Sequence, residues 1–294
     1  TQASARLLFG VATVRIFSGQ LSAAYESAQL LLHETSAANL TLLEGWAHDT
    51  LGRIDYERNR LDSAAAHFAA LRRRCYALHR GCAYDGFAGS LLLAAVQGNT
   101  SLMVEITDEW RAFEQSLWGL PTTLFYSTQA RAALLTGDVG AAMRWAESYR
   151  EPMTPAPMSW LETSHITKVR CLLAAGAPHH LEEADALAAA CLAQAERTHN
   201  VLAWVQLAAL HALVLACRGE HQAAGKTLAA ALRVAEPESF VRSFVDLGAP
   251  MADLLRAVKE RTLASYVAAL LRAFPPSALR GAAPGAPAAG GTVI

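Results

Sequence analysis

Residues 134–146 read LLTGDVGAAMRWA: an apolar segment, a turn at Gly137 and a second apolar segment. Residues 215–229, LACRGEHQAAGKTLA, repeat this plan around Gly219. Turn-prone residues recur at intervals of 39 to 43 residues along the whole chain, at Gly19, Asn59, Gly98, Gly137, Gly176 and Gly219. Self-similarity at such a period predicts a solenoid of stacked helix–turn–helix units.

A small residue marks the helix that follows most of these turns. Alanine stands five residues after the turn at Ala24, Ala64, Ala142 and Ala224, where a small side chain lets two helices approach closely. After Gly98 this position holds Met103. After Gly176 the matching residue is Ala184, eight residues on, which indicates a three-residue insertion around His179-His180. We expect these two histidines to lie in an exposed loop.

The composition favours helix throughout, because alanine and leucine, the strongest helix formers, dominate the sequence. Residues 48–76 fit the tetratricopeptide (TPR) pattern best, with Leu51-Gly52 in the first helix and Ala64 and Phe68 in the second. The sequence therefore predicts an all-α fold, an α-α superhelix of the TPR-like solenoid type with about six helix pairs. We expect the array to span residues 1–235, helices that cap it to span 236–274, and a flexible Pro/Gly/Ala linker to span 275–294.

The segment EPESFVRSFVDLGAPMADLL, residues 236–255, breaks the helical pattern between two prolines. We expect Phe240, Phe244 and Val245 to cover the exposed apolar end of the array. Gly248 can end this short segment, and Pro250 suits the first turn of a helix that carries Met251, Leu254 and Leu255.

Charge and cysteine content narrow the function classes. The net charge of −1 provides no basic surface for nucleic acid or an anionic membrane. No apolar run reaches the roughly 20 residues that span a bilayer. The start, TQASARLLFG, lacks a signal-peptide pattern and resembles a cut into a helix, so we expect a fragment. The five cysteines have no paired spacing, which favours the reducing cytoplasm.

Three motifs suggest chemistry, and each has a simpler interpretation. Residues 224–227, AGKT, resemble the end of a phosphate-binding loop, but Glu220 stands where its first glycine is needed and a helix surrounds Lys226. Arg72, Arg73 and Arg74 suit the negative end of a helix. Cys75, His79 and Cys82 could share a helical face as metal ligands, although a fourth ligand is missing nearby and buried cysteines explain them as well. We expect no catalysis, no metal and no cofactor in this fragment.

Arginines at one repeat position form the strongest candidate site. Arg53, Arg131 and Arg170 are separated by 78 and 39 residues, on first helices that line the concave groove of TPR solenoids. Other candidates on first helices near this position are Trp46, Asp49, Tyr56, Ser127, Trp160 and Trp204. Arginine and tryptophan often supply binding energy at interfaces, so these residues could bind an effector or partner. They could equally keep a narrow interior polar, paired with neighbours such as Asp49 or Glu57.

The run that begins Phe240-Val241-Arg242-Ser243-Phe244-Val245-Asp246 and ends Pro250-Met251-x-x-Leu254-Leu255 resembles a phrase of the large ATP-binding LuxR-type transcriptional regulators of the MalT-like kind. Ser239 replaces a usual glycine and Leu247 a usual acidic residue. The segments LGRIDYERNRL, residues 51–61, and YVAALLRAF, residues 266–274, are also similar to that family. The resemblance covers essentially the whole chain.

This resemblance implies the sensor module of a transcriptional regulator. In the family, the array receives a small-molecule inducer or a regulatory protein and contacts an ATP-binding switch domain, and a helix-turn-helix domain follows the linker. ATP would bind only in that missing N-terminal domain, and the fragment itself would not bind DNA. The alternative is a constitutive TPR scaffold that binds a peptide or protein partner.

Overall fold

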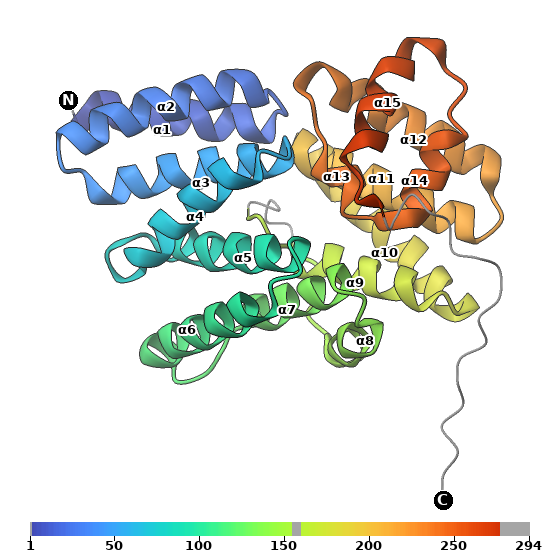
Figure 1. The fold of residues 1–294 in the computed structure, drawn as a ribbon, viewed down its shortest axis with the longest axis horizontal. Helices are drawn as coiled ribbons and strands as arrows, with labels where there is room; N and C mark the ends of the chain where they lie inside the picture. Colours follow the sequence, from blue (N-terminus) through green and yellow to red (C-terminus); the bar gives the residue numbers. More distant parts are fainter. Residues whose placement is uncertain (1, 155–159, 277–294) are drawn as a thin grey trace, which may run out of the picture.

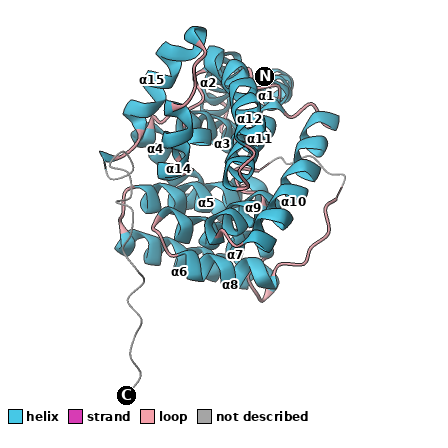
Figure 2. Cartoon of the chain, turned by 90° about the vertical axis from the view of Figure 1, so that its right-hand side faces the viewer, coloured by secondary structure: helices cyan, strands magenta, loops and turns pink. Residues whose placement is uncertain are grey.

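The computed structural model describes residues 2–154 and 160–276, and Figure 1 shows that this part of the chain is helical from end to end. No strand occurs among these residues (Figure 2). The α-helices are α1 (Gln2–Phe17), α2 (Leu21–Ala37), α3 (Thr41–Glu57), α4 (Leu61–Arg73), α5 (Arg80–Val96), α6 (Thr100–Trp118), α7 (Thr123–Leu135), α8 (Val139–Ser148), α9 (Ser164–Ala175), α10 (Pro178–Arg197), α11 (Val201–Cys217), α12 (His221–Ala235), α13 (Arg242–Val245), α14 (Gly248–Arg256) and α15 (Ala264–Ala273).

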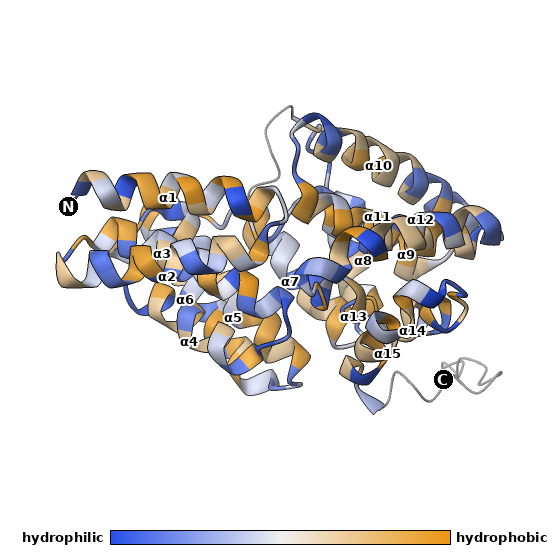
Figure 3. Cartoon of the chain, turned by 90° about the horizontal axis from the view of Figure 1, so that it is seen from above, coloured by the Kyte–Doolittle hydropathy of each residue, from blue (hydrophilic) through white to orange (hydrophobic). Residues whose placement is uncertain are grey.

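Helices α1 to α12 form six antiparallel pairs, as the 39-residue period predicts. Seen from above, α1–α6 lie on one side, α8–α12 lie on the other with α13–α15, and α7 runs between them (Figure 3). The predicted all-α superhelix is therefore confirmed. Within the described residues, no helix is both long and apolar enough to cross a membrane.

The turn within each pair uses a left-handed backbone conformation. All six turn residues predicted from the sequence have positive φ, between 59° at Asn59 and 87° at Gly137. Glycine and asparagine adopt this conformation at the lowest cost, which explains why the period is visible in the sequence. Some turns between pairs do the same, at Asn39, Gly119 and His199, and the sequence pattern alone did not reveal them.

Close helix packing on a small residue follows five of the six turns. Ala24, Ala64, Ala142, Ala184 and Ala224 are all fully buried, which confirms their role as small contact residues. In the best TPR unit, Phe68 lies so close to α3 that a methyl group on Gly52 would come within 2.9 Å of its ring. On the other side, the same ring leaves only 2.5 Å for a side chain on Gly89 of α5.

The insertion around His179-His180 forms helix instead of the expected loop. Both histidines lie in the first turn of α10, where Pro178 takes the favourable first position. The extra residues lengthen α10 to 20 residues, so the insertion is absorbed as added helix and Ala184 still reaches the buried contact.

The segment after α12 does more than cover the end of the array. Phe240 and Phe244 are fully buried in a core that contains residues of α11, α12, α14 and α15, as expected of a cap. The same core also contains Ile54 of α3, from the second repeat. The superhelix therefore curves far enough to bring its last elements against its first ones, and Val201 of α11 lies against Gly19. The predicted linker lies largely outside the described residues.

Two glycine substitutions test the turn geometry. Gly98→Ala should lower the free energy of unfolding by about 1 kcal/mol, because alanine must adopt a φ of 67° there. Gly225→Ala should raise it by about 0.5–1 kcal/mol, because Gly225 lies exposed inside α12 with open space around it. Urea denaturation measures the free energy of unfolding of both variants. If both substitutions raised it, or both lowered it, the turn assignment would be contradicted.

Candidate functional site

The interior of the superhelix holds most of the predicted site residues, and they are buried. Arg53 is 7% exposed and lies 3.7 Å from the Asp49 carboxylate on its own helix. It also lies 3.9 Å from Asp85 of α5, which is fully buried. The Asp85 carboxylate accepts hydrogen bonds from the backbone N–H of Leu161. Arg53 and Asp49 are thus paired with each other, the second of the two interpretations that the sequence left open.

The Arg53 guanidinium lies between two buried carboxylates, those of Asp49 and Asp85. Burial raises the pKa of Asp49, against the opposing charge of Arg53. Burial and then repulsion from Asp49 raise the pKa of Asp85 well above its usual range. The pair therefore retains a proton to a higher pH than separate aspartates would.

Arg131 of α7 connects two segments that lie inside the superhelix. Its side chain is 4% exposed. One end donates to the backbone carbonyl of Leu161 at 3.2 Å and lies 3.3 Å from the Glu162 carboxylate. The other end lies 3.3 Å from the carboxylate of Asp246. Glu162 also accepts bonds from Ser127 and Thr167, so Ser127 holds this carboxylate in place.

Residues 236–247 form what we call the strap, a segment that crosses from α12 to the first repeats. Its Asp246 accepts a hydrogen bond from the Tyr56 hydroxyl at 2.7 Å and pairs with Arg242. Burial alone would raise the pKa of Asp246, but Arg242 and Arg131 outweigh it and lower that pKa. Asp246 is therefore ionised at neutral pH.

Backbone contacts fix the strap to the end of α3. The N–H of Val241 donates to the Glu57 carbonyl, and the N–H of Ser243 donates to the Glu57 carboxylate, each at 2.9 Å. Beyond the helix, Arg58 pairs with Glu238 at 3.0 Å. These bonds join residues more than 170 positions apart and close the superhelix on itself.

Arg170 of α9 differs from the two arginines with which it aligns. Among the described residues it has no ion pair within 4 Å, whereas Arg53 and Arg131 have two each. Burial and then the charge of Arg131 lower its pKa to about 10. The aligned positions thus hold chemically different arginines: Arg53 and Arg131 each lie beside two carboxylates, and Arg170 lies beside none within ion-pair distance among the described residues.

The three predicted tryptophans do not form one surface. Trp160 lies before α9 and not on a first helix, so that prediction was wrong. It does stack on Trp46, with 6.1 Å between ring centroids. Its ring also lies so close to α5 that a methyl group on Gly81 would come within 2.0 Å. Trp204 of α11 instead packs on the core of the last repeats and donates to Glu196.

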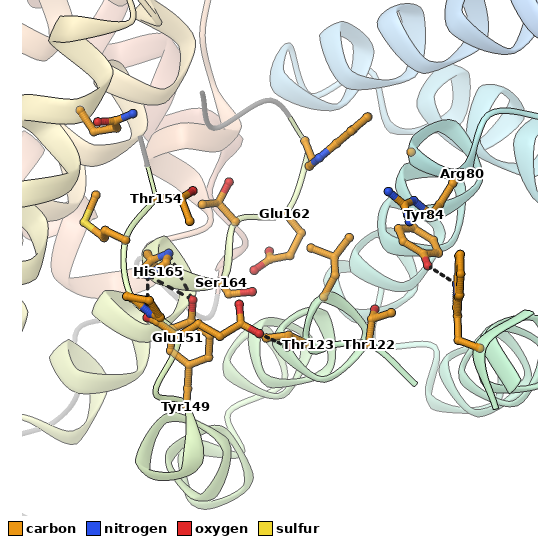
Figure 4. A pocket seen from close by; sticks show the side chains of 18 residues that line it. Arg80, Tyr84, Thr122, Thr123, Tyr149, Glu151, Thr154, Glu162, Ser164 and His165 are labelled. Atoms are coloured by element: carbon orange, nitrogen blue, oxygen red, sulfur yellow. Dashed lines mark hydrogen bonds between the residues drawn. The ribbon is translucent and has the colours of Figure 1, made fainter. Parts of the chain in front are cut away.

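A cavity of about 510 Å³ opens beside the interior, where α5, α7 and α9 begin (Figure 4). Of the predicted site residues, only Trp160 lines it. The other lining residues are Arg80, Gly81, Tyr84, Trp118, Thr122, Thr123, Leu124, Tyr149, Glu151, Pro152, Met153, Thr154, Glu162, Thr163, Ser164, His165 and Gln194. The starts of three helices line this space, and helix N-termini carry a partial positive charge, beside the carboxylates of Glu151 and Glu162.

Polar and aromatic side chains both line the cavity wall (Figure 4). The Tyr149 hydroxyl lies 3.2 Å from the ring nitrogens of His165, and burial followed by the charge of Glu151 raises the pKa of that hydroxyl. Opposite them, Trp118 donates to the Tyr84 hydroxyl at 3.1 Å, and the Arg80 guanidinium lies over the Trp118 ring. Such a wall can bind the flat face and the polar groups of a small molecule.

Sequence reasoning missed this cavity because much of its lining lies between α8 and α9. A signal was available: residues 149–163 contain three prolines, which predict a long connection in place of helix within this repeat. Long connections in compact domains often carry function.

The weaker sequence motifs lie in ordinary structural positions. Cys75 and Cys82 are not on one helix, because α5 starts at Arg80 and His79 caps it through its side chain. In the described ranges, no group of three or more metal-ligating residues could hold an ion. Lys226 lies inside α12, and two residues of the arginine run, Arg72 and Arg74, pair with glutamates.

These features together define a helical-repeat domain of the TPR class, whose members generally bind proteins or ligands. A family model described as the MalT-like TPR region matches residues 2–261, and the chain belongs to this family. A comparison with curated proteins finds no match.

Substitution of Arg131, which has two ion pairs, should cost more stability than substitution of Arg170, which has none among the described residues. Arg131→Met leaves Glu162 and Asp246 buried without their shared cation and should lower the free energy of unfolding by about 3–5 kcal/mol. Arg170→Met removes a cation that has no ion pair and should change it by less than about 1 kcal/mol. Urea denaturation compares the two; equal losses would contradict the assignment of partners.

Glu57 should make stability depend on pH. Burial raises its pKa from 4.5 to about 7, against the stabilising N–H of Ser243. Folding thus favours the protonated form, and the free energy of unfolding should fall by about 3 kcal/mol as pH rises from 4.5 to 7.

Denaturation of Glu57→Gln at pH 5 and pH 8 checks this contribution. The variant should lose less stability than the wild type between these values, because glutamine cannot ionise. Glu182→Gln, on the exposed face of α10, is the matched control and should follow the wild type. Parallel pH profiles for the wild type and Glu57→Gln would contradict the prediction.

Proposed function

We propose that this chain is the effector-sensing module of a LuxR-type, MalT-like transcriptional regulator, and that a small-molecule inducer binds in the 510 Å³ cavity. The observation that carries the proposal is the position of this cavity. Its wall includes Glu162, which is bonded through Arg131 to the strap. A ligand there would touch the network that holds the two ends of the superhelix together.

The size and lining of the cavity favour a small polar ligand. A volume near 500 Å³ lies in the range of small-molecule pockets, about 300–1,000 Å³. Tyr84, Trp118 and Tyr149 offer aromatic faces, while Thr123, Ser164 and the backbone at the helix starts offer hydrogen bonds. An inducer that combines a flat or apolar part with several polar groups fits this lining.

The burial of the concave groove disfavours the alternative of a constitutive peptide scaffold. An extended peptide along the first helices would have to displace Leu161, Glu162 and the strap, together with their bonds to buried charges. A regulatory protein remains compatible with the proposal if it docks on the outer surface.

The wider functional assignments follow from the family. We assign ATP binding, DNA binding and transcriptional output to other domains of such a regulator, with this array contacting the switch domain in the cytoplasm. We assign this array no catalysis of its own. Inducer binding would act by favouring one arrangement of the array over another.

A ligand screen with two filled-cavity variants tests the proposal. Differential scanning fluorimetry of the wild type against a panel of sugars, amino acids, nucleotides and organic acids should find a compound that raises Tm. Thr154→Trp fills the cavity from its exposed rim and should abolish that shift. The control, Val104→Trp, fills a separate hollow of about 580 Å³ between α6, α7 and α8 and should preserve it.

No stabilising compound in the panel would count against small-molecule sensing. A shift that survives in Thr154→Trp but disappears in Val104→Trp would place the ligand in the second hollow and contradict the assignment of the cavity.

A further inference from the structure

Arg131 is shared between two carboxylates that belong to different segments of the chain. Glu162 stands in the cavity wall, just before α9, and Asp246 stands at the end of α13 in the strap. Both lie 3.3 Å from the guanidinium, one at each of its terminal nitrogens. Within the described residues, Arg131 is the one side chain whose ion pairs reach both segments.

Burial strengthens the ion pairs of Arg131 with Glu162 and Asp246. Glu162 is 1% exposed and Arg131 is 4% exposed, so neither water nor salt screens the charges well. A buried guanidinium without any anion costs several kcal/mol. Arg131 therefore needs at least one of the two carboxylates in place, and losing one increases its dependence on the other.

The neighbouring charges strengthen this dependence. Arg170 and Arg242 face the same interior and add two positive charges. Asp246 has its own further partners in Arg242 and Tyr56, and Glu162 has Ser127 and Thr167. Each carboxylate is thus held by its own partners when the other moves away. Arg131 therefore keeps one anion beside it in either case.

We propose that Arg131 couples the cavity to the strap: withdrawal of Glu162 from Arg131 tightens the attachment of Asp246, and release of Asp246 tightens the attachment of Glu162. The proposal rests on the proposed function, since an inducer in the cavity is what would withdraw Glu162. An inducer that engages this carboxylate then locks the strap, and with it the closed form of the superhelix. By linkage, the coupling acts equally in both directions.

Amide hydrogen exchange of the intact chain, without any ligand, tests the coupling. Glu162→Gln neutralises the cavity-side anion, and exchange of peptides covering residues 240–245 should slow by about fivefold, which corresponds to about 1 kcal/mol. If Glu162→Gln only destabilised the fold, exchange of these peptides would become faster. The coupling predicts slower exchange, so the two effects can be told apart.

Glu114→Gln is the matched control. Glu114 is also a fully buried glutamate with three accepted hydrogen bonds, from Trp110 and Thr122, but it has no contact with Arg131. Strap exchange in this variant should stay the same as in the wild type or become faster.

A reciprocal variant keeps the proposal testable if Glu162→Gln does not fold. Asp246→Asn should slow exchange around Leu161 and Glu162 by a similar factor, because Glu162 becomes the only anion of Arg131. Unchanged or faster exchange of the strap in Glu162→Gln, or of residues 160–166 in Asp246→Asn, would overturn the coupling. Since no ligand is present, this outcome is independent of whether the cavity binds an inducer.

Discussion

A buried guanidinium must keep an anion beside it, and the interior of this superhelix is arranged around that constraint. Arg131 draws Glu162 from the segment before α9 and Asp246 from the strap into a space that a TPR solenoid would otherwise leave as an open groove. Asp246 in turn fixes the strap against Tyr56 of α3. The second repeat and the strap that follows the last repeat are therefore joined by buried polar and charged contacts, not only by the stacking of neighbouring helices.

This closure explains where a ligand can and cannot bind. The inner surface is occupied by the chain's own segments, and the cavity that we propose as the ligand site lies at its edge, where α5, α7 and α9 begin. The cavity wall and the closing strap share one arginine. Under the proposed function, occupancy of the cavity would change how firmly the whole array is closed, without any large movement of a single repeat.

The sequence carried the local part of this structure and not the long-range part. The positive-φ turns at Gly137 and Gly219, and buried alanines such as Ala24, follow from rules that act within one helix pair, so the fold was predictable. The roles of Arg53, Arg131 and Arg170 were not. Beyond the Asp49 of its own helix, Arg53 pairs with Asp85 of the next repeat, and Arg131 pairs with Glu162 of a connection and Asp246 of the strap. Arg170 has no ion pair among the described residues. Alignment within the repeats made the three arginines appear equivalent, and packing made them different.

The closed superhelix depends on the attachment of the strap to α3, and two backbone amides report on this attachment directly. The N–H groups of Val241 and Ser243 both donate to Glu57 and not to a helical carbonyl. Site-resolved hydrogen exchange of the wild-type chain by NMR should find both amides protected to a degree comparable with the buried helical amides of α3. Exchange of both amides at the rate of an unprotected chain would contradict the closed superhelix described here.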